Sequence, residues 1–129
     1  PLATVITAIA SATAPREIAV IPAYSIRKAL AKAGLKLDQM DIIEINEAFA
    51  AMPLVSTKIL ADNDEKKWKE LQEKTNVNGG AIAIGHPVGA SAGRITMTMA
   101  YELRRRGGGY GVASICGGLA QGEAVIIRV

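Results

Sequence analysis

Apolar and polar positions follow strand-like and helix-like periods in turn along the chain. Leu2–Ala14 is rich in Ala, Val, Ile and Thr and carries no charge, which predicts a buried strand. From Pro22 the apolar residues recur every three or four positions, and Gly34 is a typical end for this amphipathic helix. Asp41–Ile45 predicts a short second strand, and Ala48–Ala61 predicts a second helix.

The second half of the chain continues this alternation. Asp62–Asn76 is the most charged segment, and we expect it to form a charged helical insertion on the surface. Val88–Tyr101 contains one charge and several small residues, which predicts a helix buried between layers. Gly107–Gly109 breaks the chain, and Tyr110–Ile115 and Glu123–Val129 predict two final strands. The whole order predicts one layered α/β domain.

Composition narrows the class of protein. Half of the 129 residues are hydrophobic, which is enough for the core of one domain. The net charge is only +3, the basic run Arg104–Arg106 falls at a predicted helix end, and five residues are aromatic, which together argue against a nucleic-acid-binding surface. The single Cys116 excludes an internal disulfide and a cysteine-rich metal site, and with no signal peptide or long apolar span we expect a cytoplasmic protein. Pro1 stands where an initiator Met would be, so we expect a piece of a longer polypeptide.

The only histidine, His86, lies between two glycine clusters and directly before Pro87. Proline biases the residue before it toward an extended backbone and tolerates the first position of a helix. We therefore expect a helix to begin at about Pro87, with the imidazole at its N-terminus, where free N–H groups favour an oxyanion. The alternative is a histidine that only satisfies hydrogen bonds at a tight turn.

Two other polar side chains follow predicted strands. Asn46 comes directly after Asp41–Ile45, and Cys116 ends the strand Tyr110–Ile115 just before two glycines. Open α/β sheets bind ligands at the carboxyl ends of their strands, so Asn46, His86 and Cys116 could meet at one edge. A thiol, an imidazole and a carboxamide suit acyl chemistry. Alternatively, Asn46 is a helix N-cap and Cys116 an inert core residue.

These residues belong to segments that resemble a known family. The three segments occur in the order of the three signatures of the C-terminal half of thiolases, the acetyl-CoA acetyltransferases, and the resemblance covers nearly the whole chain. They are Asn46–Ala50, Asn78–Pro87 followed by Gly89, Ser91 and Gly93, and Cys116–Gly118 followed by Gly122.

The resemblance implies a thiolase-like fold, in which this chain is one half of a five-layer αβαβα arrangement with a mixed sheet and a buried central helix. The family's nucleophilic cysteine lies in the N-terminal half, which is absent from this sequence. The implied reaction is reversible thiolytic cleavage of 3-ketoacyl-CoA, or Claisen condensation of acetyl-CoA with acyl-CoA, in lipid metabolism. It needs coenzyme A thioesters as substrates and no prosthetic group or metal. The full-length protein would be a homo-oligomer, a dimer or tetramer.

The resemblance also implies roles for single residues. Cys116 would be the acid/base that moves the proton alpha to the thioester. His86 and Asn46 would hold the thioester oxygen, Asn46 through a water molecule, and His86 would help keep the missing nucleophile ionised. Gly118 would lend its N–H to a second oxyanion hole, and Phe49 would line the pantetheine channel. By itself the chain would be inactive and would bind coenzyme A poorly.

The sequence departs from the family pattern at Leu119-Ala120, where glycine is common, which puts the pocket shape in doubt. Three rival readings stay open. A ketoacyl synthase-type condensing enzyme shares the fold but commonly uses two histidines, and this chain has only His86. A non-catalytic thiolase-like partner subunit would need no turnover of its own. A nucleotide-binding domain would use its glycines for phosphate, but the dinucleotide and P-loop spacings are missing.

Overall fold

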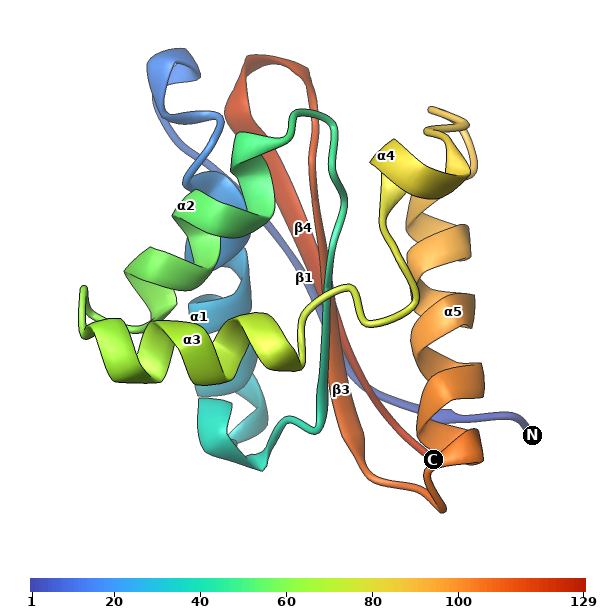
Figure 1. Cartoon of the computed structure of the whole chain (residues 1–129). Coiled ribbons are helices and arrows are strands. Elements are labelled where there is room, and N and C mark those ends of the chain that lie inside the picture. The colour runs from blue at the N-terminus through green and yellow to red at the C-terminus, as the bar shows by residue number, and fades with distance from the viewer.

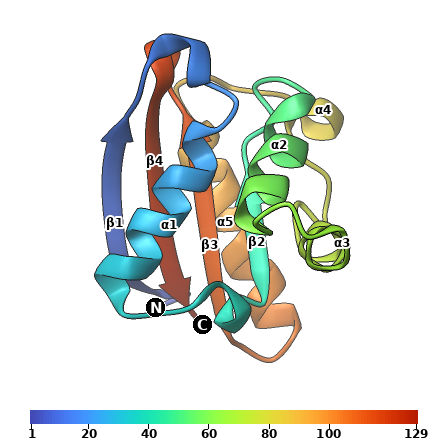
Figure 2. The same cartoon turned by 90° about the vertical axis from the view of Figure 1, so that its left-hand side faces the viewer.

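The computed structural model describes residues 1–129 and is built on one four-stranded sheet. The strand order is β1-β4-β3-β2, as seen from left to right in Figure 2. β2 and β3 are parallel, whereas β4 is antiparallel to both β1 and β3, so the sheet is mixed. The strands are β1 (Thr4–Ala12), β2 (Ile42–Ile45), β3 (Tyr110–Cys116) and β4 (Gln121–Arg128).

Helices cover the two faces of the sheet unequally. Figure 1 shows α1, α2 and α3 on one side of the sheet, and α4 and α5 on the other. Three short 3-10 turns lie at Pro15–Glu17, Leu37–Gln39 and Gly118–Ala120. The helices are α1 (Ile21–Ala33), α2 (Ala51–Leu60), α3 (Glu65–Glu73), α4 (Ala81–Ile84) and α5 (Ser91–Arg105). None of them is long and apolar enough to cross a membrane.

The buried apolar residues form two clusters, one on each face. The cluster on the α1 side has 14 buried residues, including Ile26, Ile43 and Val112, whereas the α5 side has seven, including Ile95 and Ile127. Alternate residues of β2 contribute to opposite clusters, because successive side chains of a strand point to opposite faces. The sheet is therefore well covered by α1 and only partly covered by α5.

The first helix follows the predicted pattern closely. Ile26, Ala29 and Leu30 are buried on its inner face. Gly34 ends the helix in the left-handed conformation, with φ 65°, and its N–H donates to Ala31 O, as expected for a glycine C-cap. The helix approaches β4 closely at Gly122, where a Cβ atom would lie 2.5 Å from Ile21 Cγ1.

Two predicted elements differ in burial. β1 is an edge strand on which only Thr7 is buried, so the uncharged run was wrongly interpreted as a buried strand. α5 packs one flank on the sheet, but its outer flank is open: Met97 is 54% and Tyr101 59% exposed. Its apolar outer surface belongs to a layer that no other part of this chain covers. The helix also starts at Ser91 instead of at Pro87.

The charged segment predicted as an insertion contains α3, which packs against α2. Asp64 caps this helix by accepting a hydrogen bond from the backbone N–H of Lys67. The Trp68 indole N–H donates to Thr57 Oγ1 at 3.0 Å, and Lys58 Nζ lies 4.6 Å from the Trp68 ring centroid. Trp68 is thus the anchor of a surface helix that packs against α2, on the side of the sheet opposite α4 (Figure 1).

Side chains bond some of the backbone groups of both edge strands. On the β1 edge, Lys28 Nζ donates to Ala10 O at 2.8 Å and Lys32 Nζ to Ala8 O at 3.2 Å. On the β2 edge, the Asn76 side chain bonds the backbone of Ile45 twice, accepting from its N–H at 2.8 Å and donating to its carbonyl at 2.9 Å.

Candidate active site

Asn46 lies at the carboxyl end of β2 and is fully buried. Its backbone N–H donates to Ser114 O at 3.0 Å, which continues the parallel ladder between β2 and β3 by one residue. α2 begins only at Ala51, with Ala50 as its N-cap residue. The side chain of Asn46 is therefore not a helix cap, and its amide is available to the site.

The amide of Asn46 contacts the imidazole of His86. Asn46 Nδ2 lies 3.3 Å from His86 Nε2, and on the other side of the ring His86 Nδ1 lies 2.6 Å from Ser91 Oγ. Ser91 Oγ in turn donates to Pro87 O at 3.1 Å. One set of protons satisfies the whole chain: Ser91 accepts from Nδ1–H, and Nε2 accepts from the Asn46 amide. The ring is thus held from both sides.

The loop that carries His86 runs from Gly85 to Ala90, between α4 and α5. Gly85 has φ 107° and ψ 160°, a conformation that a side chain would disfavour. The N–H of Ala90 donates to Pro87 O at 2.7 Å, which closes a turn ahead of α5. Because of this turn, α5 starts at Ser91 and not at Pro87, where the sequence predicted its start.

A glutamate next to Asn46 ties this loop to β2. The Glu47 carboxylate accepts a hydrogen bond from the Ile82 N–H at 2.9 Å, at the start of α4. To reach it, the carboxylate lies directly against Gly80, where any Cβ atom would collide with it. Neither Glu47 nor Ser91 was predicted as a site residue from the sequence. Two sequence signals could have identified them: Glu47 directly follows Asn46, and Ser91 lies shortly after His86, in the first turn of α5.

Cys116 is the last residue of β3 and lies at the same edge of the sheet as Asn46. The register pairs Ile45 with Ser114, so Asn46 lies opposite Ile115 and Cys116 lies one residue farther along β3. Because side chains alternate, Cys116 points to the α1 face of the sheet and Asn46 to the α5 face, so the strand ends bring the two residues to one edge but not to one face. The thiol is half-buried and packs against the apolar cluster on the α1 side, and it forms no hydrogen bond to Asn46 or His86. Burial raises the pKa of the Cys116 thiol.

The turn after Cys116 contains the predicted oxyanion residue Gly118, which is exposed. Leu119 and Ala120 follow it with φ 58° and φ 59°. Only glycine adopts this left-handed conformation without strain, which is the physical reason why glycine suits these two positions. Leu119 and Ala120, where the family commonly has glycine, therefore hold a backbone conformation that is strained for residues with a side chain.

Several large apolar side chains are exposed in the segments that carry the candidate site residues. The predicted channel residue Phe49, in the turn before α2, is 60% exposed. The others are Ile82, Ile84, Val88 and Leu119, with exposed fractions of 67%, 54%, 81% and 73%. His86 itself is also exposed.

Charged side chains lie between β2 and α5 beneath the contact between Asn46 and His86. Glu44 on β2 is 1% exposed, and its burial raises the pKa to about 7 although the charge of Arg94 on α5 opposes this. Farther along α5, hydrogen bonds from Arg105, Arg106 and Asn78 lower the pKa of Glu102 to about 2. Glu102 is thus a fully engaged carboxylate, and Glu44 is not.

The family model described as Thiolase, C-terminal domain, matches residues 1–129. The chain belongs to the thiolase family. It is 52% identical over 107 residues to a probable acetyl-CoA acetyltransferase of Mycolicibacterium smegmatis, covering 83% of this chain and 26% of that protein. It is 48% identical over 128 residues to human mitochondrial 3-ketoacyl-CoA thiolase, covering 99% of this chain and 30% of that protein.

Solved thiolases have the same fold. The crystal structure of human mitochondrial 3-ketoacyl-CoA thiolase superimposes with a TM-score of 0.88 at 48% identity, and it has also been solved in complex with CoA. The match covers 99% of this chain and 30% of that chain. The predictions of a thiolase-type fold and of membership in an enzyme family are confirmed. The chain spans about 30% of the length of these relatives, so it corresponds to a C-terminal part of them.

Proposed function

We propose that this chain is the C-terminal half of an acyl-CoA acyltransferase that reversibly cleaves 3-ketoacyl-CoA and is inactive without its N-terminal half. In the cleaving direction, a cysteine thiolate of the N-terminal half attacks the C3 carbonyl of the substrate. The C2–C3 bond breaks, and its electron pair passes to C2 as the enolate of acetyl-CoA. The acyl group then passes from the cysteine to the thiol of a second coenzyme A.

In this scheme Cys116 protonates C2 of the departing enolate, and in the condensing direction it removes the same proton. Because burial raises its pKa, the thiol is protonated at neutral pH, which is the state a proton donor requires. The Asn46 amide and His86 Nε2 donate hydrogen bonds to the thioester oxygen, whose negative charge develops in the transition state. Nε2, which accepts from Asn46 in the free chain, must carry a proton for this role. Gly118 offers a backbone N–H to the other oxyanion, and Phe49 contacts the pantetheine arm.

The contact between Asn46 and His86 is the observation that carries this proposal. The two residues come from segments 40 positions apart, yet Asn46 Nδ2 and His86 Nε2 lie 3.3 Å apart at the carboxyl end of β2. Ser91 holds the far side of the ring at 2.6 Å. A fixed imidazole beside a buried amide, next to a strand that ends in a thiol, is suited to stabilise an enolate and move its proton.

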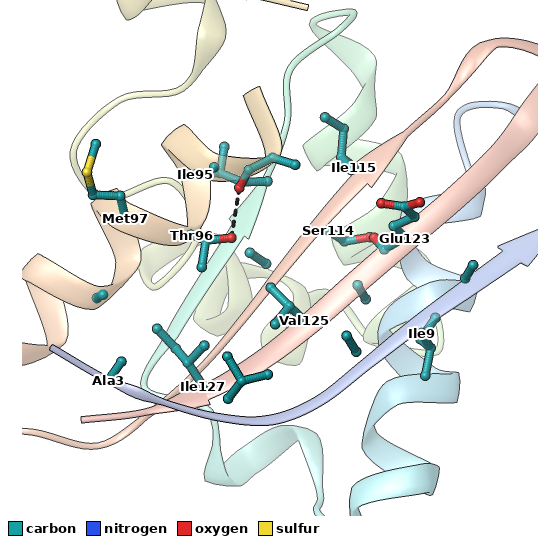
Figure 3. A pocket seen from close by; sticks show the side chains of 18 of the residues that line it. Ala3, Ile9, Ile95, Thr96, Met97, Ser114, Ile115, Glu123, Val125 and Ile127 are labelled. Atoms are coloured by element: carbon teal, nitrogen blue, oxygen red, sulfur yellow. Dashed lines mark hydrogen bonds between the residues drawn. The ribbon is translucent and has the colours of Figure 1, made fainter. Parts of the chain in front are cut away.

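The partner that this function requires is the N-terminal thiolase half, and the uncovered sheet face supports it. Figure 3 shows an apolar hollow between α5 and the strands β1, β3 and β4. It has a volume of about 750 Å³, and 15 of its 19 lining residues are hydrophobic. On the same side, a Cβ atom added at Gly89 or Gly93 would meet open space out to 4 Å, so a partner layer can approach closely there.

A complementation assay tests the proposal. The chain is mixed with a matching N-terminal thiolase half, and cleavage of acetoacetyl-CoA is followed as thioester loss. We expect activity only in the mixture, and we expect Cys116→Ala and His86→Ala each to lower it at least about 100-fold. Activity that survives both changes, or full turnover by the chain alone, would contradict the proposed roles.

Two further properties of the full-length protein belong to this proposal. Assembly as a dimer or tetramer is expected, and light scattering of the complemented protein measures it directly. A cytoplasmic location stays a prediction, for which cell fractionation is the test. Participation in lipid metabolism depends on the acyl-chain length, which a substrate series from acetoacetyl-CoA to long-chain 3-ketoacyl-CoA would determine.

A further inference from the structure

The segment between Asn76 and His86 is bonded to three successive residues at the end of β2. Asn76 bonds both backbone groups of Ile45, at 2.8 Å and 2.9 Å. The amide nitrogen of the next residue, Asn46, lies 3.3 Å from His86 Nε2. The residue after it, Glu47, bonds the helix α4 between the other two contacts. The start, the middle and the end of this segment are therefore all fixed to one strand end.

The Glu47 carboxylate bonds the first turn of α4. It accepts a hydrogen bond from the backbone N–H of Ile82 at 2.9 Å. Ile82 is the second residue of the helix, so its N–H has no partner inside the helix. A hydrogen bond from a backbone N–H to a carboxylate is stronger than one between neutral groups. Gly80 is buried against the same carboxylate and leaves it room, because a Cβ atom there would collide with it.

Little apolar packing attaches α4 to the rest of the chain. Ala81 is its only buried residue, whereas Ile82 and Ile84 are 67% and 54% exposed. A helix of four residues is not stable by itself, so its position depends on its tertiary contacts. The Gly85 N–H closes the turn by donating to Ala81 O at 2.7 Å, and His86 follows directly. The position of α4 therefore determines where the backbone of His86 lies.

We propose that Glu47 is a positioning residue, whose carboxylate fastens α4 to the end of β2 and thereby holds the His86 imidazole beside the Asn46 amide. Glu47 acts through α4 and not on the substrate. Two consecutive residues of one strand end then hold the imidazole, Asn46 directly and Glu47 through the helix. The inference rests on the proposed function only for the catalytic value of the contact between His86 and Asn46.

Two substitutions of Glu47 separate the reach of its side chain from its charge. Glu47→Gln keeps the length and an acceptor oxygen, whereas Glu47→Asp keeps the charge but is one methylene shorter. In the 129-residue chain, NMR measures solvent exchange of the Ile82 N–H and the nuclear Overhauser effects between the Asn46 side-chain amide and the His86 ring protons. We expect Glu47→Asp to speed exchange at Ile82 about tenfold and to remove most of the Overhauser intensity. Glu47→Gln should keep both near the parent values.

Asp64→Ala is the matched control for these measurements. The Asp64 carboxylate accepts the Lys67 N–H at 2.8 Å at the start of α3, so the change removes the same kind of bond from a helix that does not lead to His86. It should leave the Overhauser effects unchanged. Glu47→Ala should behave as Glu47→Asp does, and the comparison of Glu47→Asp with Glu47→Gln decides the question if Glu47→Ala does not fold. Unchanged Overhauser effects in Glu47→Asp, or an equal loss in Asp64→Ala, would overturn the inference.

The same variants in the complemented enzyme separate this inference from the proposed function. Glu47→Asp should lower kcat about tenfold with KM nearly unchanged, because the position of the imidazole changes and the substrate-binding surface does not. Glu47→Gln should retain the kcat of the parent. If the parent complex is active and Glu47→Asp keeps full kcat, the positioning role is overturned. If the chain shows the expected NMR changes but the parent complex has no thiolytic activity, the proposed function fails and the attachment of the imidazole through Glu47 stands.

Discussion

Ser91 Oγ lies 2.6 Å from His86 Nδ1 and determines which ring nitrogen faces Asn46. Ser91→Ala removes this bond and frees the ring to rotate. In the complemented enzyme we expect kcat to fall at least about tenfold, because the imidazole then spends little time in the orientation that the reaction needs. Thr75→Ala is the control, since Thr75 also bonds the carbonyl four residues before it, at Leu71, and lies outside the hollow beside α5. A similar loss of kcat in both variants would contradict a specific role for Ser91.

The glycine at position 80 leaves room for the Glu47 carboxylate. Its φ of −102° is ordinary, so Gly80→Ala tests steric contact without backbone strain. We expect the free energy of unfolding to fall by about 1–3 kcal/mol, because the Glu47 side chain must leave its bond to Ile82. Urea denaturation measures this. In a Glu47→Ala background the same change should cost almost nothing, and an equal cost in both backgrounds would show that another contact is responsible.

Gly93 on the open flank of α5 distinguishes the isolated chain from the assembled protein. No atom lies within 4 Å of the place its Cβ would take. In the isolated chain, Gly93→Ala should raise the free energy of unfolding by about 1 kcal/mol, because alanine favours a helix. With the N-terminal half present, the added methyl group should weaken association of the halves at least about tenfold. Equal affinity for the parent and the variant would mean that the partner does not dock on this flank.

Leu119 holds a left-handed conformation in the turn beside Cys116, with φ 58°, and its side chain is 73% exposed. Leu119→Gly should therefore raise the free energy of unfolding by about 0.5–1 kcal/mol, after allowance for the greater freedom of glycine in the unfolded chain. Leu119→Ala keeps the strain and should be neutral. Thermal unfolding followed by circular dichroism compares the three proteins, and destabilisation by the glycine would show that Leu119 contributes contacts.

Glu44 makes stability depend on pH near neutrality. Its folded-state pKa of about 7 lies above the value of 4.5 for a free carboxyl, so the folded state keeps the proton longer. The stabilising contribution of the neutral carboxyl is complete below pH 4.5 and is lost as the pH rises through 7. Between about pH 5 and about pH 8 the free energy of unfolding should fall by up to about 3 kcal/mol more in the parent than in Glu44→Gln. Parallel pH profiles of the two proteins would contradict this.

The sequence predicted most of the helices and strands, but not which of them would be exposed. The helix that ends at Gly34 and the strand before Asn46 were predictable, because periodicity and capping depend on neighbours in sequence. The contact between Asn46 and His86 was anticipated as a meeting at one edge. The exposure of β1 and of the outer flank of α5 was not, since an apolar run does not reveal whether its covering layer belongs to the same chain. The burial of Glu44, which is 1% exposed, depends on tertiary packing, which no local pattern encodes.

The engagement of both sheet edges limits how this chain can associate. Lys28 and Lys32 occupy carbonyl groups of the outermost strand, and Asn76 occupies both backbone groups of Ile45 at the opposite margin. Strand-by-strand extension, the usual route to fibrous self-assembly, is therefore discouraged in both directions. The surface that remains for binding another protein part is the apolar face of the sheet beside α5. Specific association of this chain therefore depends on packing one structural layer against another.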